Sequence, residues 1–117
     1  MQVELKRIYE QPAASDGFRV LVDRLWPRGV SKERAEIDLW AKDAAPSTAL
    51  RQSFHHGMAW DDFAAAYARE LAEGTALTDL RRELASHDVV TLLYAAHDEE
   101  RNHAMLLREA LLAGSSA

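Results

Sequence analysis

The sequence contains no cysteine among its 117 residues. It can therefore form no disulfide framework, it has no thiolate nucleophile, and it cannot bind zinc through cysteine ligands. Proteins without disulfides are typical of the reducing interior of the cell. We therefore expect a cytoplasmic location.

Long hydrophobic runs are missing as well. No apolar stretch approaches the roughly 20 residues of a membrane-spanning helix, and the opening segment MQVELKRIYE mixes charged and apolar residues, unlike a secretory signal. No membrane association is expected. The length of 117 residues, with 48% hydrophobic and 28% charged residues, predicts one domain over residues 1–117 with a single core.

Positive charge is scarce. The chain has 14 Lys and Arg against 19 Asp and Glu, a formal net charge of −5, which disfavours a broad nucleic-acid-binding surface. The balance of basic and acidic residues differs between the two halves of the chain. Through His56 there are nine basic and eight acidic residues, and from Gly57 onward five and eleven. We therefore expect any anion-binding surface to lie in the first half of the chain.

Glycine-rich phosphate loops are also absent, which excludes the P-loop and the Rossmann dinucleotide fingerprint. Imidazole is a common metal ligand, but His55, His56, His97 and His103 form no H-x-x-x-H pair and no two-histidine–carboxylate pattern. No metal site is predicted, and the residues identify no cofactor.

The patterns that are present predict an α/β fold. The apolar and β-branched runs predict strands, and the apolar stripes with i, i+3, i+4 spacing predict helices between them. Strands separated by helices favour a small single-domain sandwich with a short, mainly parallel sheet and helices packed around it. The predicted strands are Val3–Tyr9, Phe18–Leu25 and Asp88–Ala96. The predicted helices cover Ser47–His56, Trp60–Gly74, Leu77–Leu84 and a last segment capped by Asp98, and Ile37–Ala44 is expected to be a turn or short helix.

Unusual polar and aromatic residues follow two of these strands. In open α/β sheets, ligands bind beyond the carboxyl ends of the strands. If both strands run parallel in one sheet, the residues that follow them converge at one edge. The end of the second strand and the residues after it contribute Asp23, Arg24, Trp26 and Arg28, and the end of the last strand and the residues after it contribute Tyr94, His97, Asn102 and His103.

The helix after Pro46 adds a third set of residues. Ser47, Arg51 and His55 are spaced i, i+4, i+8 and share one face of that helix. Lys42 precedes it and adds another cation. Ser47 is well placed to cap the helix, and nothing around it resembles a nucleophile elbow.

Several residues allow two interpretations. Asp23 with Arg24 and Arg28 forms either a buried structural ion pair or an anion site, since two arginines suit bidentate recognition of phosphate or carboxylate. Trp26 is either core or a platform for stacking a ring. His103 is either a core histidine bonded to a backbone carbonyl or a general acid and base.

Three blocks of the chain resemble a known family. They are VDRLWPRGVSKE, W-x-K-x-x-A-P-S-x-x-L-R-x-x-F-x-H between Trp40 and His56, and LLYAAHDEERNHAMLL. These blocks are similar to the YeaO-like family, filed as domain of unknown function 488. The resemblance implies a small bacterial α/β protein with no agreed activity. The matching positions are Asp23, Arg24, Trp26, Pro27, Arg28, Gly29, Lys42, Pro46, Ser47, Arg51, Asn102 and His103, together with one of the pair His55 and His56.

The functional expectation is a crevice lined by arginine, lysine and histidine that binds a small anionic ligand bearing phosphate or carboxylate, with a nucleotide-like molecule as one candidate. Hydrolysis, transfer and binding without chemistry all remain open. The alternative is a non-catalytic binding or regulatory module, homodimeric in one version, with the arginines in structural ion pairs. The candidate catalytic residues are His103, His55 and Asp23, and the candidate ligand-binding residues are Arg24, Trp26, Arg28, Lys42, Ser47, Arg51, Tyr94 and Asn102.

Overall fold

The computed structural model describes residues 1–113. The strands are β1 (Gln2–Arg7), β2 (Phe18–Leu21), β3 (Leu39–Trp40) and β4 (Val89–Tyr94). The α-helices are α1 (Lys32–Ala35), α2 (Thr48–His55), α3 (Trp60–Glu73), α4 (Ala76–Leu84) and α5 (His103–Ala113), and two 3-10 turns are η1 (Ala14–Asp16) and η2 (Lys42–Ala44).

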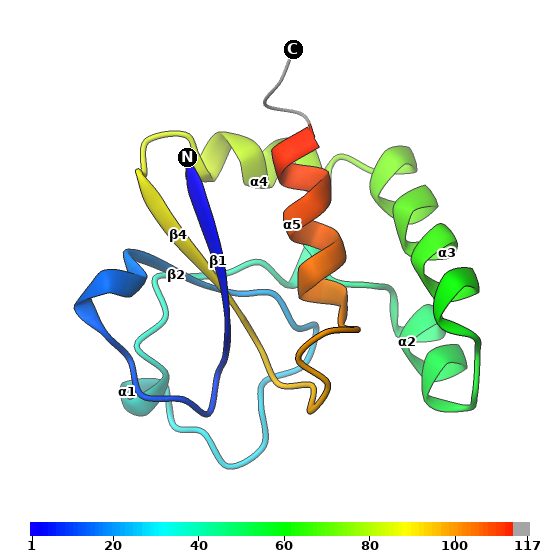
Figure 1. Cartoon of the computed structure of the whole chain (residues 1–117), viewed down its shortest axis with the longest axis horizontal. Helices are drawn as coiled ribbons and strands as arrows, with labels where there is room; N and C mark the ends of the chain where they lie inside the picture. Colours follow the sequence, from blue (N-terminus) through cyan, green and yellow to red (C-terminus); the bar gives the residue numbers. More distant parts are fainter. Residues whose placement is uncertain (114–117) are drawn as a thin grey trace.

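The strands form one four-stranded sheet in the order β1-β4-β2-β3 (Figure 1). All of its pairings are parallel, which confirms the predicted fold class. The last strand, β4, lies between the first two, with Val3 opposite Val90 and Val20 opposite Leu92. The carboxyl ends of β1, β2 and β4 therefore meet at the same edge of the sheet.

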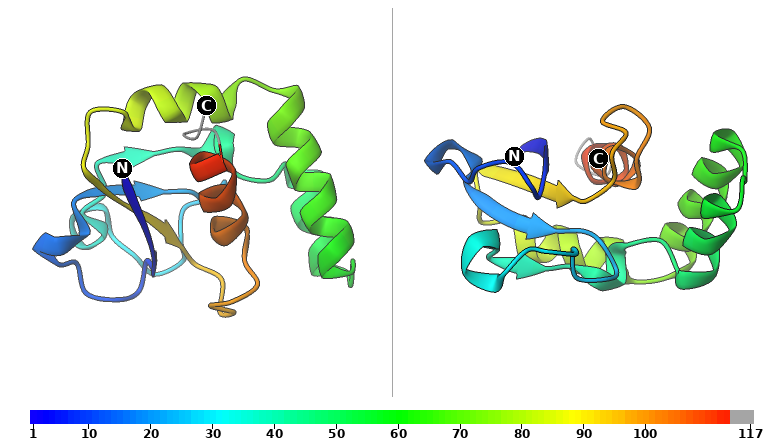
Figure 2. Two further views of the ribbon diagram at one scale, coloured as in Figure 1. Left: turned by 45° about the horizontal axis from the view of Figure 1, so that its top comes forward. Right: turned by 90° about the horizontal axis from the view of Figure 1, so that it is seen from below.

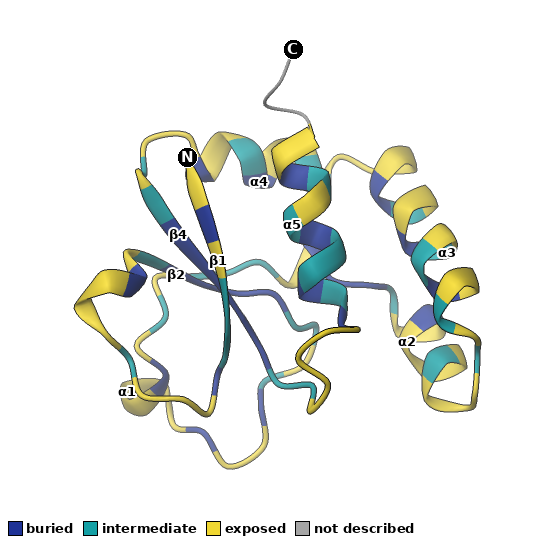
Figure 3. Cartoon of the chain, viewed as in Figure 1, coloured by how far each residue is buried: buried dark blue, intermediate teal, exposed yellow. Residues whose placement is uncertain are grey.

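Strand β4 is buried on both faces, as its continuous apolar run predicts. Val90, Leu92 and Tyr94 pack in the larger core with the helices, while Leu93 packs in a second, smaller core. Figure 3 shows β2 and β4 as the most continuously buried strands of the sheet. A strand covered on both sides needs neighbours on both edges, because its backbone groups cannot reach water.

Helices α2 to α5 contribute to the larger core. Leu107 and Leu111 of α5, Tyr67 of α3 and Leu84 of α4 are among its most buried residues. Helix α5 lies between the sheet and α3 in all views (Figures 1 and 2). Tyr67 also donates a hydrogen bond to the carbonyl of Ala44, which joins α3 to η2.

The opposite face of the sheet is covered by the segment between β2 and β3, which contains α1. Its Val30 packs with Leu21 and Leu93 of the sheet in the second core, and Trp26 and Trp40 lie against this cluster. The two indole rings meet edge to face with their centroids 5.4 Å apart. Short segments thus cover this face of the sheet, whereas long helices cover the other face.

Three sequence expectations differ from the structure. Ile37–Ala44 was expected to be a turn or short helix. Its last three residues do form the 3-10 turn η2, but the segment also contains β3, which is too short to carry a readable period-2 pattern. The second strand ends at Leu21 rather than Leu25. Asp98 does not cap the last helix. Its Oδ1 accepts hydrogen bonds from the amides of Glu100 and Arg101, in a turn that precedes the helix.

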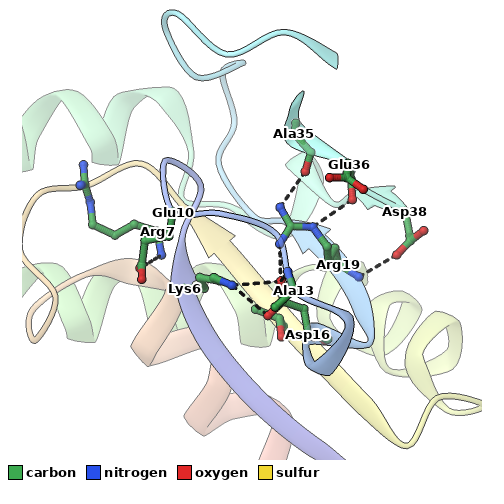
Figure 4. A network of polar contacts seen from close by, with 10 residues as sticks. Lys6, Arg7, Glu10, Ala13, Asp16, Arg19, Ala35, Glu36 and Asp38 are labelled. Carbon is green, nitrogen blue, oxygen red and sulfur yellow. Dashed lines mark hydrogen bonds and ion pairs between the residues drawn. The ribbon is translucent and has the colours of Figure 1, made fainter. Parts of the chain in front are cut away.

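A buried network of charges holds η1 against β1 and β2 (Figure 4). Asp16 pairs with Arg19 at 2.6 Å and with Lys6 at 3.1 Å. The Arg19 guanidinium also donates to the carbonyls of Ala35 and Glu36. Burial alone raises the pKa of Asp16, but hydrogen bonds from the Ala13 amide, Lys6 and Arg19 outweigh it and hold the pKa below its ordinary value.

Gly17 lets this network form next to β4. Its φ of 66° lies in the left-handed region, and a Cβ at this position would lie 2.3 Å from the carbonyl oxygen of Val89. Only glycine meets both conditions. The turn therefore packs directly on the start of β4, where Thr91 donates a hydrogen bond to the Asp16 carbonyl.

Asp16→Asn is expected to lower the free energy of unfolding by about 3 kcal/mol, because it leaves the buried Arg19 without its counter-ion. The lowered pKa means that ionised Asp16 stabilises the fold above the unfolded-state value of about 3.9, and that this contribution is lost as the pH falls further. Urea unfolding at pH 7 and across the acid range measures both effects.

The matched control is Asp79→Asn, which removes an exposed carboxylate 3.5 Å from Arg82. This pair should contribute less than about 0.5 kcal/mol. Equal stability losses in the two variants would contradict the structural role given to Asp16.

Candidate functional site

Asp23 joins the ends of the two central strands. It comes two residues after β2 ends, and its Oδ2 accepts a hydrogen bond of 3.0 Å from the amide of Ala95, the residue after β4. Just before it, the amide of Val22 donates to the carbonyl of Leu93. The two strand ends therefore lie side by side, as the sequence hypothesis requires.

His103 faces the same strand end from the first position of α5. Its Nε2 lies 2.9 Å from the carbonyl oxygen of Val22 and 3.0 Å from Asp23 Oδ1. Both neighbours are acceptors, so Nε2 carries a proton in every protonation state that satisfies them. The angle favours the carbonyl, and the buried Asp23 Oδ1 accepts no hydrogen bond from residues 1–113. The other ring nitrogen, Nδ1, has no hydrogen-bond partner within that range.

Arg24 is held by backbone carbonyls instead of a carboxylate. Its Nε donates to the carbonyl of Pro46 at 3.0 Å and its Nη2 to that of Ala45 at 3.2 Å. It makes no ion pair with any residue between 1 and 113. The guanidinium is thus fixed in position while its full positive charge remains available to a bound molecule.

These groups line a cavity of about 710 Å³ at the carboxyl edge of the sheet. One wall is aromatic and consists of Phe54, Trp60 and Phe63. Phe54 stacks on Phe63 with centroids 4.4 Å apart, and Trp60 lies 5.7 Å from Phe63. The volume falls within the range of small-molecule sites in proteins.

Cations outnumber carboxylates around this cavity. Arg24, Arg51 and Arg101 line it, against Asp23 and Asp98. Arg51 and Arg101 are exposed and make no ion pair within the described part of the chain. The backbone amides of Arg101 and Glu100 lower the pKa of Asp98. Both carboxylates accept hydrogen bonds from backbone amides, and the three guanidinium groups still outnumber the two carboxylates around the cavity.

The cavity contains about half of the residues that the sequence singles out. They are Asp23, Arg24, Arg51, His55, Asn102 and His103. Asn102 is buried, and both polar atoms of its amide group form a hydrogen bond. Its Oδ1 accepts from the Met105 amide and its Nδ2 donates to the Asp98 carbonyl, so it is the residue that caps α5.

The remaining candidates lie outside this cavity. Trp26 donates to the Val30 carbonyl within the second core, and Lys42 lies over the Trp40 ring at 4.9 Å. Ser47 caps α2 and binds Glu70. Tyr94 is 3% exposed, and burial raises the pKa of its hydroxyl. Arg28 is exposed, and its carbonyl accepts a hydrogen bond from Tyr9.

Other cavity residues have no ligand-binding signal in the sequence. Trp60 and Phe63 belong to an apolar helical stripe that predicts only core packing. The fold shows that both residues also line the cavity. Arg101 lies in the second, acidic half of the chain, where the sequence analysis expects no anion-binding surface. Its position between a strand end and a helix is the feature that could have identified it.

Some site types are not found in residues 1–113. No group of three or more histidine or acidic side chains in this part of the chain is arranged to hold a metal ion. In the same range, every helix is too short or too polar to cross a membrane.

Comparison with known proteins places the chain in a family. Residues 2–116 match a family model described as the inactive DUF488-N3 subclade. The chain belongs to the DUF488 family. The match covers every element of the fold and confirms the resemblance inferred from the three sequence blocks.

Relatives of this DUF488 chain occur in distant bacteria. It is 41% identical over 114 residues to the uncharacterized protein YeaO of Escherichia coli, covering 93% of this chain and 96% of the relative. It is also 41% identical over 111 residues to uncharacterized proteins of Mycobacterium tuberculosis and Mycobacterium bovis, covering 94% of this chain and 93% of the relatives. No solved structure is significantly similar to it.

The position of Ser47 predicts a structural role that can be measured. Its Oγ accepts from the Leu50 amide and donates to Glu70. Ser47→Ala should therefore lower the free energy of unfolding by about 1–2 kcal/mol through loss of the cap and of the link to α3. Thermal or urea unfolding measures the loss.

Ser53→Ala, at an exposed position of the same helix, serves as the matched control and should change stability by less than about 0.5 kcal/mol. If Ser47→Ala proved as mild as Ser53→Ala, the capping role of Ser47 would be wrong.

Proposed function

We propose that this DUF488 protein binds a small molecule that joins an anionic group to an aromatic or other apolar ring, in the cavity at the carboxyl edge of its sheet. The observation that carries the proposal is the convergence of Arg24, Arg51 and Arg101. These arginines come from three separate segments, line one cavity, and have no carboxylate partner within the described residues.

Unpaired arginines in a shared cavity favour an anion as their partner. Guanidinium groups are usually committed to carboxylates, phosphates or carbonyls when they are held in place. The amino end of α5 also opens at the cavity, because Asn102 and His103 line it. Its helix dipole adds partial positive charge to the same space.

The aromatic wall supports the second part of the proposal. Phe54 and Trp60 are partly buried and offer a surface, backed by the buried Phe63, on which a ring can stack. Stacking on aromatic side chains tolerates many ring types. Free phosphate or another compact anion would leave this wall exposed to water. A ring linked to the anion covers it.

Binding without turnover is the version of the function that the observations favour. The chain has no cysteine, and no serine or threonine among residues 1–113 lines the cavity. His103 therefore has no hydroxyl or thiol nucleophile within the cavity to activate. The description of the matched subclade as inactive agrees with this interpretation.

The experiment compares ligands that separate the two recognition elements. Phenyl phosphate and adenosine monophosphate carry both a ring and an anion, phenol and adenosine carry the ring alone, and inorganic phosphate carries the anion alone. Thermal shift and isothermal titration calorimetry should detect binding of the first pair and much weaker or no binding of the other three.

Variants then locate the site. Arg51→Ala and Arg101→Ala should each weaken binding of phenyl phosphate about tenfold, because each removes one charge-assisted contact. Arg28→Ala is the matched control, since Arg28 is exposed and lies outside the cavity. Equal weakening by all three variants, or no binding of either ring-bearing anion, would overturn the proposal.

A further inference from the structure

We propose that the bound anion and a proton enter this site together, with His103 becoming a fourth cation of the cavity as the anion binds. The inference rests on the proposed function and adds a ligand-binding group to it. It follows from the positions of His103 and Asp23 and from the charges that surround them.

The first step concerns the proton already on the ring. Nε2 of His103 lies between the Val22 carbonyl and Asp23 Oδ1, at 2.9 and 3.0 Å, and therefore keeps its hydrogen. A second proton can be added only at Nδ1, which has no partner among residues 1–113. The change from neutral to cationic imidazole thus occurs at the one ring atom that the protein leaves open.

The second step concerns Asp23. Its Oδ2 accepts from the Ala95 amide, and its Oδ1 is buried next to His103 without a hydrogen bond from the described residues. A carboxylate at 3.0 Å stabilises the imidazolium. Asp23 is therefore a positioning residue that orients the ring and balances its charge.

The third step concerns the groups that oppose protonation. The N-terminus of α5 and the guanidinium groups of Arg24, Arg51 and Arg101 place positive charge around the same cavity. His55 from α2 and His97 after β4 also line it and add charge when protonated. Asp98 is the other acidic group there. From α3, the Tyr67 ring meets His103 edge to face at 6.5 Å, and burial raises the pKa of its hydroxyl, so it stays neutral.

A bound anion changes this balance. It offsets the repulsion from the arginines and leaves the attraction of Asp23, so protonation of His103 becomes more favourable. By thermodynamic linkage, a proton on His103 must then strengthen anion binding by the same factor. The site is expected to select anions more strongly as the pH falls through the range in which histidine titrates.

The test uses phenyl sulfate and the full chain, because the sulfate ester keeps one negative charge while histidine titrates. Calorimetry in two buffers of different ionisation enthalpy counts the protons taken up on binding. Wild-type protein should take up protons near neutral pH, and its affinity should fall by up to about tenfold per pH unit as the pH rises.

Variants assign the proton. His103→Gln should remove most of the uptake while binding at high pH persists. The matched control His56→Gln, at an exposed residue outside the cavity, should retain the uptake. Ring nitrogen shifts of His103, measured by NMR in wild-type protein, should show Nε2 protonated and Nδ1 bare at high pH, and both protonated once phenyl sulfate is bound.

The outcomes separate the two proposals. Binding of phenyl sulfate without proton uptake, or uptake that survives in His103→Gln, would overturn this inference and leave the proposed function intact. The NMR result in the wild type decides the matter if His103→Gln fails to fold. No binding of any ring-bearing anion at any pH overturns both.

Discussion

The insertion of β4 between β1 and β2 is the constraint on which the site depends. The first two strands do not pair with each other. Each pairs instead with β4, which comes some 70 residues after β2 in the chain. Because all the pairings are parallel, this insertion places Asp23 next to Ala95 and brings α5 over the strand ends. Asp23, Asn102 and His103 take their positions from that arrangement.

Arg19 and Arg24 have different kinds of partner. Arg19 is buried on one face of the sheet and pairs with Asp16, so its charge is balanced inside the fold. Arg24 lies at the edge and is held by two carbonyl oxygens, which fix its geometry but leave its charge unbalanced. Arg19 serves stability. In Arg24, pairing with carbonyl oxygens instead of a carboxylate leaves the positive charge without a counter-ion among residues 1–113.

Much of the fold could be predicted where a local pattern is long enough. The apolar run around β4, the stripe of α3 and the Ser47 cap of α2 each identify their element, because hydrophobic periodicity and caps act over a few residues. The two residues of β3 carry no such pattern. Asn102 caps the last helix instead of Asp98, because both residues have capping side chains and only the backbone path decides which one caps a helix.

The sequence by itself determined the fold class, the family and the absence of any cysteine-based chemistry, because composition, periodicity and motif spacing are properties of the chain. It also indicated which polar residues follow the strands. The tertiary structure alone decided which of these share a cavity, leaving Arg28 and Trp26 outside and bringing in Arg101 and the aromatic wall. Contacts between distant segments depend on strand order and on the direction of each side chain, and neither is written in local sequence.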